Sequence, residues 1–88
     1  MAAKKQKISN EPKGIVFFSK WFRAHRGLSQ RDLAGLIGVS NSFIAQIELG
    51  QHTLPVDYMK MLYHVADIQE RQYLMECLYS ELDRYVAT

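Results

Sequence analysis

The sequence predicts an all-α fold of five helices. From residue 14 onward, apolar residues recur at spacings of three and four, which places them on one face of a helix. Glycine and proline are sparse, with five and two in 88 residues, and no stretch alternates apolar and polar residues as a strand would. A chain of this length makes one domain with a single modest core.

The first helix is predicted from Gly14 to Arg26. Ile15, Phe18 and Phe22 form one apolar stripe along it, and Gly27 provides the stop. The residues before this helix, 1–13, are polar and rich in lysine, as in a flexible basic tail.

A pair of short helices follows, joined at Gly38, where the absence of a Cβ atom suits a left-handed turn. Ser29 is a good N-cap for the second helix, and Asp32 completes a capping box. Ser40 caps the third helix, which we expect to end at Gly50.

The two short helices carry apolar residues in one register, so both faces bury together: Leu33, Ala34, Ile37, Val39, Ile44 and Ile47. The residues left outward on the third helix are small or carry amides, and none is charged: Ser40, Asn41, Ser42, Ala45 and Gln46. A surface of this kind can enter the major groove of DNA and read base edges.

Two more helices complete the fold. The fourth begins near Pro55 and turns inward the residues Val56, Met59, Leu62 and Ala66. The fifth starts at Asp67, with Glu70 as the second member of a capping box, and continues to about Val86.

The charge is unevenly distributed. Residues 1–56 contain eight lysines or arginines and three acids, a net charge of +5. Residues 57–88 contain three lysines or arginines and six acids, a net charge of −3. A basic N-terminal part and an acidic C-terminal part are typical of a protein that binds a polyanion. A mixed solubilising surface would have the same composition.

The stretch from Gln30 to Glu48, QRDLAGLIGVSNSFIAQIE, resembles the helix-turn-helix of the family that includes phage lambda repressor and Cro. The resemblance covers about residues 15–68, and the chain departs from it at Ser19, where the family usually has an apolar residue. It implies a lambda-repressor-like DNA-binding domain over 14–68 with a C-terminal helix over 69–88.

The resemblance also implies roles for individual residues. Asn41, Ser42 and Gln46 occupy the base-reading positions. The residues expected at the DNA backbone are Gln30, Arg31, Ser40, Phe43, Lys4, Lys5 and Lys7. Alternatives stay open for three of these sites: Ser40 as a helix cap only, Phe43 as a shield for the third helix, and the lysines as a solubilising tail.

Arg23 and Glu48 match a pair that, in the family, ties the first helix to the recognition helix. The alternative is a plain exposed glutamate in a last helical turn, where the helix dipole disfavours an acid.

The fifth helix has a wider apolar stripe than an edge helix needs, and we expect it to pair two copies of the chain through Leu74, Met75, Leu78, Tyr79, Leu82, Tyr85 and Val86. The alternative is a larger share in the domain's own core.

No constellation supports catalysis, so we expect neither an enzyme nor a cofactor. His25, His52 and His64 lie on different segments and share no metal-ligand spacing with Cys77, the single cysteine. One cysteine and no membrane-length apolar run fit a reducing cytoplasm.

The sequence therefore predicts a sequence-specific regulator that binds double-stranded DNA: a small dimeric repressor of phage or mobile-element type reading a palindromic operator. The alternative is an antitoxin-type interaction module whose C-terminal helix binds a different protein.

Overall fold

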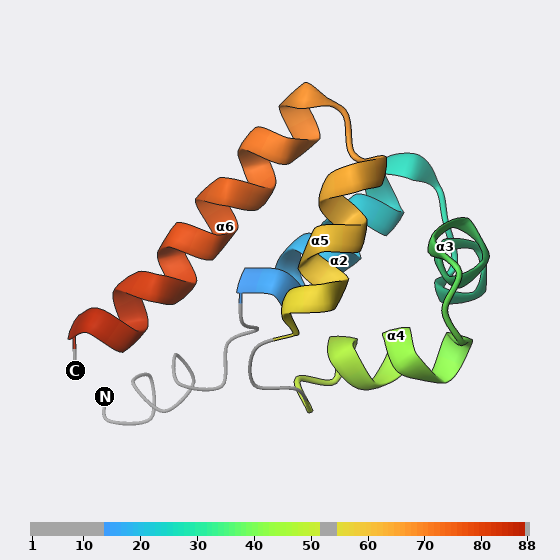
Figure 1. Cartoon of the computed structure of the whole chain (residues 1–88), viewed down its shortest axis with the longest axis horizontal. Coiled ribbons are helices and arrows are strands. Elements are labelled where there is room, and N and C mark those ends of the chain that lie inside the picture. Colours follow the sequence, from blue (N-terminus) through green and yellow to red (C-terminus); the bar gives the residue numbers. More distant parts are fainter. Residues whose placement is uncertain (1–13, 52–54, 88) are drawn as a thin grey trace.

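The structure, a computed structural model, describes residues 14–51 and 55–87, with the side chains of the last helix described as far as Tyr79. The all-α prediction is confirmed: these residues form five helices and no strand (Figure 1). The helices are α2 (Gly14–Arg26), α3 (Gln30–Ile37), α4 (Asn41–Glu48), α5 (Val56–Val65) and α6 (Ile68–Ala87). None of the helices in this part of the chain is both long and apolar enough to cross a membrane.

Local sequence signals set the ends of α3 and α4. The Ser29 hydroxyl accepts from the backbone N–H of Asp32, and the Asp32 carboxylate accepts from that of Ser29, so the predicted capping box is confirmed. Gly38 ends α3 in the left-handed region, with φ of 79°. Helix α4 ends at Glu48, with Leu49 as its C-cap, two residues before the predicted Gly50.

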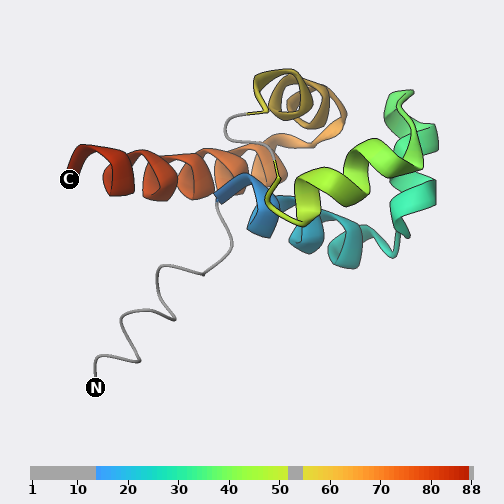
Figure 2. The same cartoon turned by 90° about the horizontal axis from the view of Figure 1, so that it is seen from below.

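Helix α2 is the centre of the domain, because α4 packs on one part of it and α6 along another (Figures 1 and 2). The rings of Phe18 and Phe22 are fully buried. Aromatic contacts join α2 to α6: the Trp21 and Tyr73 ring centroids are 4.6 Å apart, and those of Phe18 and Tyr73 are 6.1 Å apart. These contacts fix α6 against the core.

The inward face of α5 differs from the prediction at one position. Leu62 is buried as expected, but Val56 is 48% exposed and Tyr58 is completely buried instead. Tyr58 lies four residues before Leu62 and therefore shares its helical face, whereas Val56 lies at the start of α5, off that face.

A buried glutamate, Glu70, joins the ends of three helices. It accepts two hydrogen bonds from the guanidinium of Arg26, at 2.6 and 3.0 Å, and completes the predicted capping box with Asp67. Arg26 also donates to the carbonyl of Val65 at 3.0 Å. These bonds hold the end of α2 against the junction between α5 and α6, so they set where α6 begins.

The conformation of Gly38 can be tested against Gly35, which lies inside α3. A Cβ atom at either position would meet nothing within 4 Å, so only the backbone differs. Gly38→Ala should destabilise the fold by about 1–2 kcal/mol, because alanine is strained at positive φ. Gly35→Ala should stabilise it by about 0.5–1 kcal/mol, because alanine favours a helix interior. Urea unfolding measures both, and equal effects of the two changes would contradict this account.

Candidate nucleic-acid interface

The exposed face of α4 presents the residues that the sequence assigned to base reading. Asn41, Ser42 and Gln46 are all exposed. The hydroxyl of Ser40 accepts from the backbone N–H of Phe43 at 3.1 Å, so Ser40 caps the helix. The face is uncharged and lies at the start of a helix, which suits hydrogen bonding to base edges.

Behind this face lies a buried cluster centred on Glu48, which we call the Glu48 cluster: Glu48, Arg23, Ser19, Gln30 and Tyr58. Arg23 donates from Nε and Nη2 to the two carboxylate oxygens of Glu48, at 2.9 and 2.8 Å. Ser19 donates to the same carboxylate at 2.5 Å, and the Gln30 amide donates at 3.1 Å. One carboxylate thus joins α2, α3 and α4.

The hydrogen bonds of the cluster have a defined direction. The Ser19 Oγ lies 2.6 Å from the Tyr58 hydroxyl as well as 2.5 Å from Glu48. A serine hydroxyl has one proton, and an ionised carboxylate only accepts, so Ser19 donates to Glu48 and Tyr58 donates to Ser19. Burial raises the pKa of Tyr58 to about 12, which keeps this donor protonated. Through Tyr58 the cluster also reaches α5.

Glu48 is ionised although it is buried. Burial by itself raises the pKa of this carboxyl, but hydrogen bonds from Arg23, Ser19 and Gln30 outweigh that effect and leave the pKa below its ordinary value. Among the described residues, no buried side-chain nitrogen or oxygen lacks a hydrogen-bond partner. The charge is therefore compensated, and its partners fix the position of α4.

The residues assigned to the DNA backbone occupy different settings. Gln30 lies at the start of α3 with one amide hydrogen directed to Glu48, and Arg31 beside it is exposed. A recess of about 290 Å³ separates Gln30 from Lys20, a cation on α2 that the sequence analysis did not assign.

Phe43 is partly buried and packs edge-on against Tyr58, with the ring centroids 5.9 Å apart. This contact joins α4 to α5. Lys4, Lys5 and Lys7 lie outside the described residues.

Sequence reasoning identified Arg23 and Glu48 but missed the other members of the cluster. The polar residue at position 19, a departure from the family pattern, is buried and donates to Glu48. Ser19 and Tyr58 are 39 residues apart in the chain, so no spacing rule links them. The signals in the sequence were the family pair of Arg23 and Glu48 and the unusual polar residue at position 19.

The residues expected to pair two copies of the chain divide into three groups. Leu74 is only 1% exposed and belongs to the core, so it is not available to a partner, contrary to the prediction. Met75 and Tyr79, one turn apart on α6, are 43% and 63% exposed, and Leu78 is partly buried. The side chains of Leu82, Tyr85 and Val86 lie outside those that the structure describes.

No group of three or more histidine, cysteine or acidic side chains in the described part of the chain could hold a metal ion. Cys77 is buried on α6, and burial raises the pKa of its thiol. A buried, protonated thiol is a packing residue and not a reactive one.

Residues 20–63, half of the chain, match the model of the helix-turn-helix family that includes Cro and lambda repressor. The chain belongs to this family. No curated protein and no solved structure matches it. The matched segment contains α3, α4 and most of α5 together with the part of α2 that provides Arg23, so it includes most of the Glu48 cluster. This helix-turn-helix protein is a DNA-binding transcription regulator.

The coupling between Arg23 and Glu48 can be measured with a double-mutant cycle. Arg23→Met should destabilise the fold by about 3–5 kcal/mol, because it leaves the buried charge of Glu48 without its arginine, and Glu48→Met should cost less, because Arg23 is partly exposed. The double variant should lose less than the sum of the two. Arg31→Met, at an exposed arginine, is the control and should change stability by less than about 0.5 kcal/mol. Additive losses in chemical unfolding would contradict the pair.

The Glu48 cluster and the Arg26–Glu70 pair together predict acid lability. The pKa values of Glu48 and Glu70 are both lowered from 4.5 by folding, so their stabilising contribution is complete above that value. It is lost as the pH falls through the lowered values, because protons then bind the unfolded chain more readily. The melting temperature should therefore drop below about pH 4.5, and Glu48→Gln should reduce the drop. An identical pH dependence in the variant and the wild type, followed by circular dichroism, would count against this assignment.

Proposed function

We propose that the protein is a homodimeric repressor that reads a palindromic operator in double-stranded DNA through α4. The observation that carries this proposal is the uncharged face of Asn41, Ser42 and Gln46, exposed on a helix whose buried side is anchored by Glu48. A rigid support matters because bidentate hydrogen bonds to a base tolerate little displacement.

In the proposed complex, α4 lies in the major groove with its exposed face towards the bases. Asparagine and glutamine side chains can each bind adenine in bidentate fashion, because the amide nitrogen donates to N7 and the amide oxygen accepts from the N6 amino group. Gln30, Arg31 and Ser40 would hold the sugar-phosphate backbone, together with the lysines of the N-terminal tail. Gln30 can serve both partners, because its amide nitrogen has a second hydrogen besides the one donated to Glu48.

Phe43 is proposed to contact the sugar-phosphate backbone with its exposed edge while its ring supports α4 from within. A single helix-turn-helix reads few bases, so selectivity requires a second copy. Two copies related by a two-fold axis would place their recognition helices about 34 Å apart, one turn of DNA. We propose a phage or a mobile element as the setting of this regulator.

An antitoxin-type module is the second candidate. It is favoured by the apolar side chains of Met75 and Tyr79, which stay exposed on α6 away from the recognition face. In that case a different protein would cover α6, and DNA binding would be secondary.

Base reading by Gln46 is testable with DNA selected from a random pool by the wild-type protein. Gln46→Ala should weaken binding to the selected site by about 1–3 kcal/mol and relax the preference at one base position per half-site. Gln69→Ala removes an exposed glutamine from the first turn of α6, outside the groove between α5 and α6, and should leave affinity unchanged. Fluorescence anisotropy measures both. If Gln46→Ala weakened binding to unrelated DNA by the same amount, Gln46 would be a backbone contact only.

A further inference from the structure

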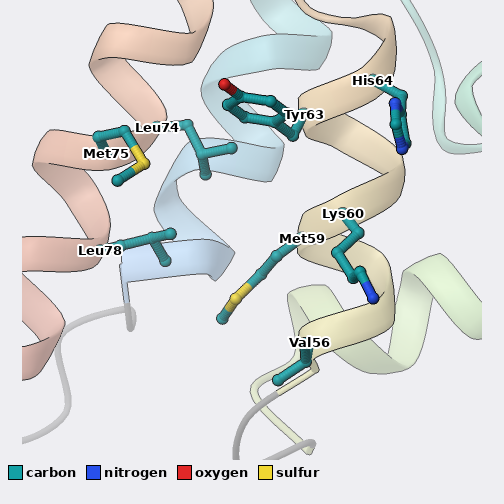
Figure 3. A pocket seen from close by; sticks show the side chains of 8 residues that line it. All are labelled: Val56, Met59, Lys60, Tyr63, His64, Leu74, Met75 and Leu78. Atoms are coloured by element: carbon teal, nitrogen blue, oxygen red, sulfur yellow. The ribbon is translucent and has the colours of Figure 1, made fainter.

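An apolar groove runs between α5 and α6, away from the recognition face, and core residues form part of its lining. The two helices meet at the Ala66–Asp67 junction and diverge from there (Figure 1). The groove has a volume of about 390 Å³ and is lined by Val56, Met59, Lys60, Tyr63, His64, Leu74, Met75 and Leu78. Figure 3 shows Met59 and Leu78 directed towards each other across it.

Several apolar side chains at the groove are exposed to solvent. Val56, Tyr63 and Met75 are 48%, 43% and 43% exposed, and Tyr79 continues the row on α6. Contiguous apolar surface of this kind marks an interaction site. The basic side chains in its lining, Lys60 and His64, are one turn apart on α5.

Beside the groove, α6 presents a ridge that matches it. Gln72, Met75, Glu76 and Tyr79 are exposed and share one face of the helix. The ridge is apolar at Met75 and Tyr79 and acidic at Glu76, whereas the wall of the groove on α5 is apolar with a basic edge. A groove and a complementary ridge on the same molecule are what a two-fold interface requires, because each copy must offer both.

We propose that a second copy of this chain occupies the groove, with the Met75–Tyr79 ridge of each α6 inserted between α5 and α6 of the other. This inference rests on the homodimer of the proposed function and assigns that dimer a different interface. The interface is formed by the outward ridge of α6 and by α5, and the buried Leu74 contributes only to the lining of the groove.

The arrangement places the two α6 helices antiparallel, with Met75 near the two-fold axis. Glu76 of one copy then lies along the basic edge formed by Lys60 and His64 of the other. Apolar insertion provides the association energy, and the charges select the antiparallel orientation.

The solution mass of the full-length protein without DNA tests the proposal. The wild type should sediment as a dimer, and Met75→Glu should weaken association at least about tenfold, because it places a charge in an apolar groove. Ile68→Glu is the matched control: it makes the same change on the same helix at a side chain that is 68% exposed and outside the groove, and it should remain dimeric. Melting curves verify that both variants are folded.

Exchanging the charges of two exposed residues tests the antiparallel orientation of the two α6 helices. Lys60 and Glu76 are both exposed. Lys60→Glu should weaken association, and adding Glu76→Lys to it should restore association. If the double variant associated no better than Lys60→Glu alone, the proposed placement of α6 would be wrong.

A wild type that remains monomeric, or a Met75→Glu protein that associates like the wild type, would overturn the proposal. A monomeric wild type would leave the groove to a different protein. Binding to a duplex that contains a single half-site separates this failure from a failure of the proposed function, since one copy suffices there. If the protein is monomeric but still discriminates between bases in the half-site, α4 remains the DNA-reading helix and only the proposed dimer is wrong.

Discussion

The fold depends on one buried carboxylate. Glu48 is the last residue of α4, and it accepts hydrogen bonds from Arg23 on α2, from Ser19 one turn earlier, and from Gln30 at the start of α3. Dispersion forces alone would allow three short helices to slide against one another, because apolar side chains have no directional preference. The Glu48 hydrogen bonds are directional, so they fix α4 in depth and in rotation. Those are the two coordinates that decide which side chains meet the bases.

A second buried acid, Glu70, plays the equivalent part at the last residue of α2. Arg23 and Arg26 are three residues apart near the end of α2, where the helix dipole favours cations, and each binds a different buried glutamate. One pair positions the recognition helix and the other positions α6. The central helix thus orients a DNA-reading element and a long terminal helix with two ion pairs from adjacent turns.

The parts of this architecture that depend on neighbouring residues could be predicted from the sequence. The caps at Ser29 and Ser40, the turn at Gly38 and the stripe on α2 follow from local backbone chemistry and helical spacing. The Ser19–Tyr58 contact could not be predicted, because it joins positions 39 residues apart. The neighbours Leu74 and Met75 show a second limit. One residue turns a helix by about 100°, which separates a core side chain from an exposed one, and only the packing of α6 on α2 decides which is which.

Arg26 and Glu70 hold the start of α6 against the end of α2, so α6 leaves the domain in a fixed direction. In a dimer that meets along α6, that direction determines how far apart the two recognition helices stand. The number of base pairs between the halves of an operator would then be set by an ion pair remote from the bases. Two relatives with identical reading residues could prefer operators with different spacers through a change at this pair alone.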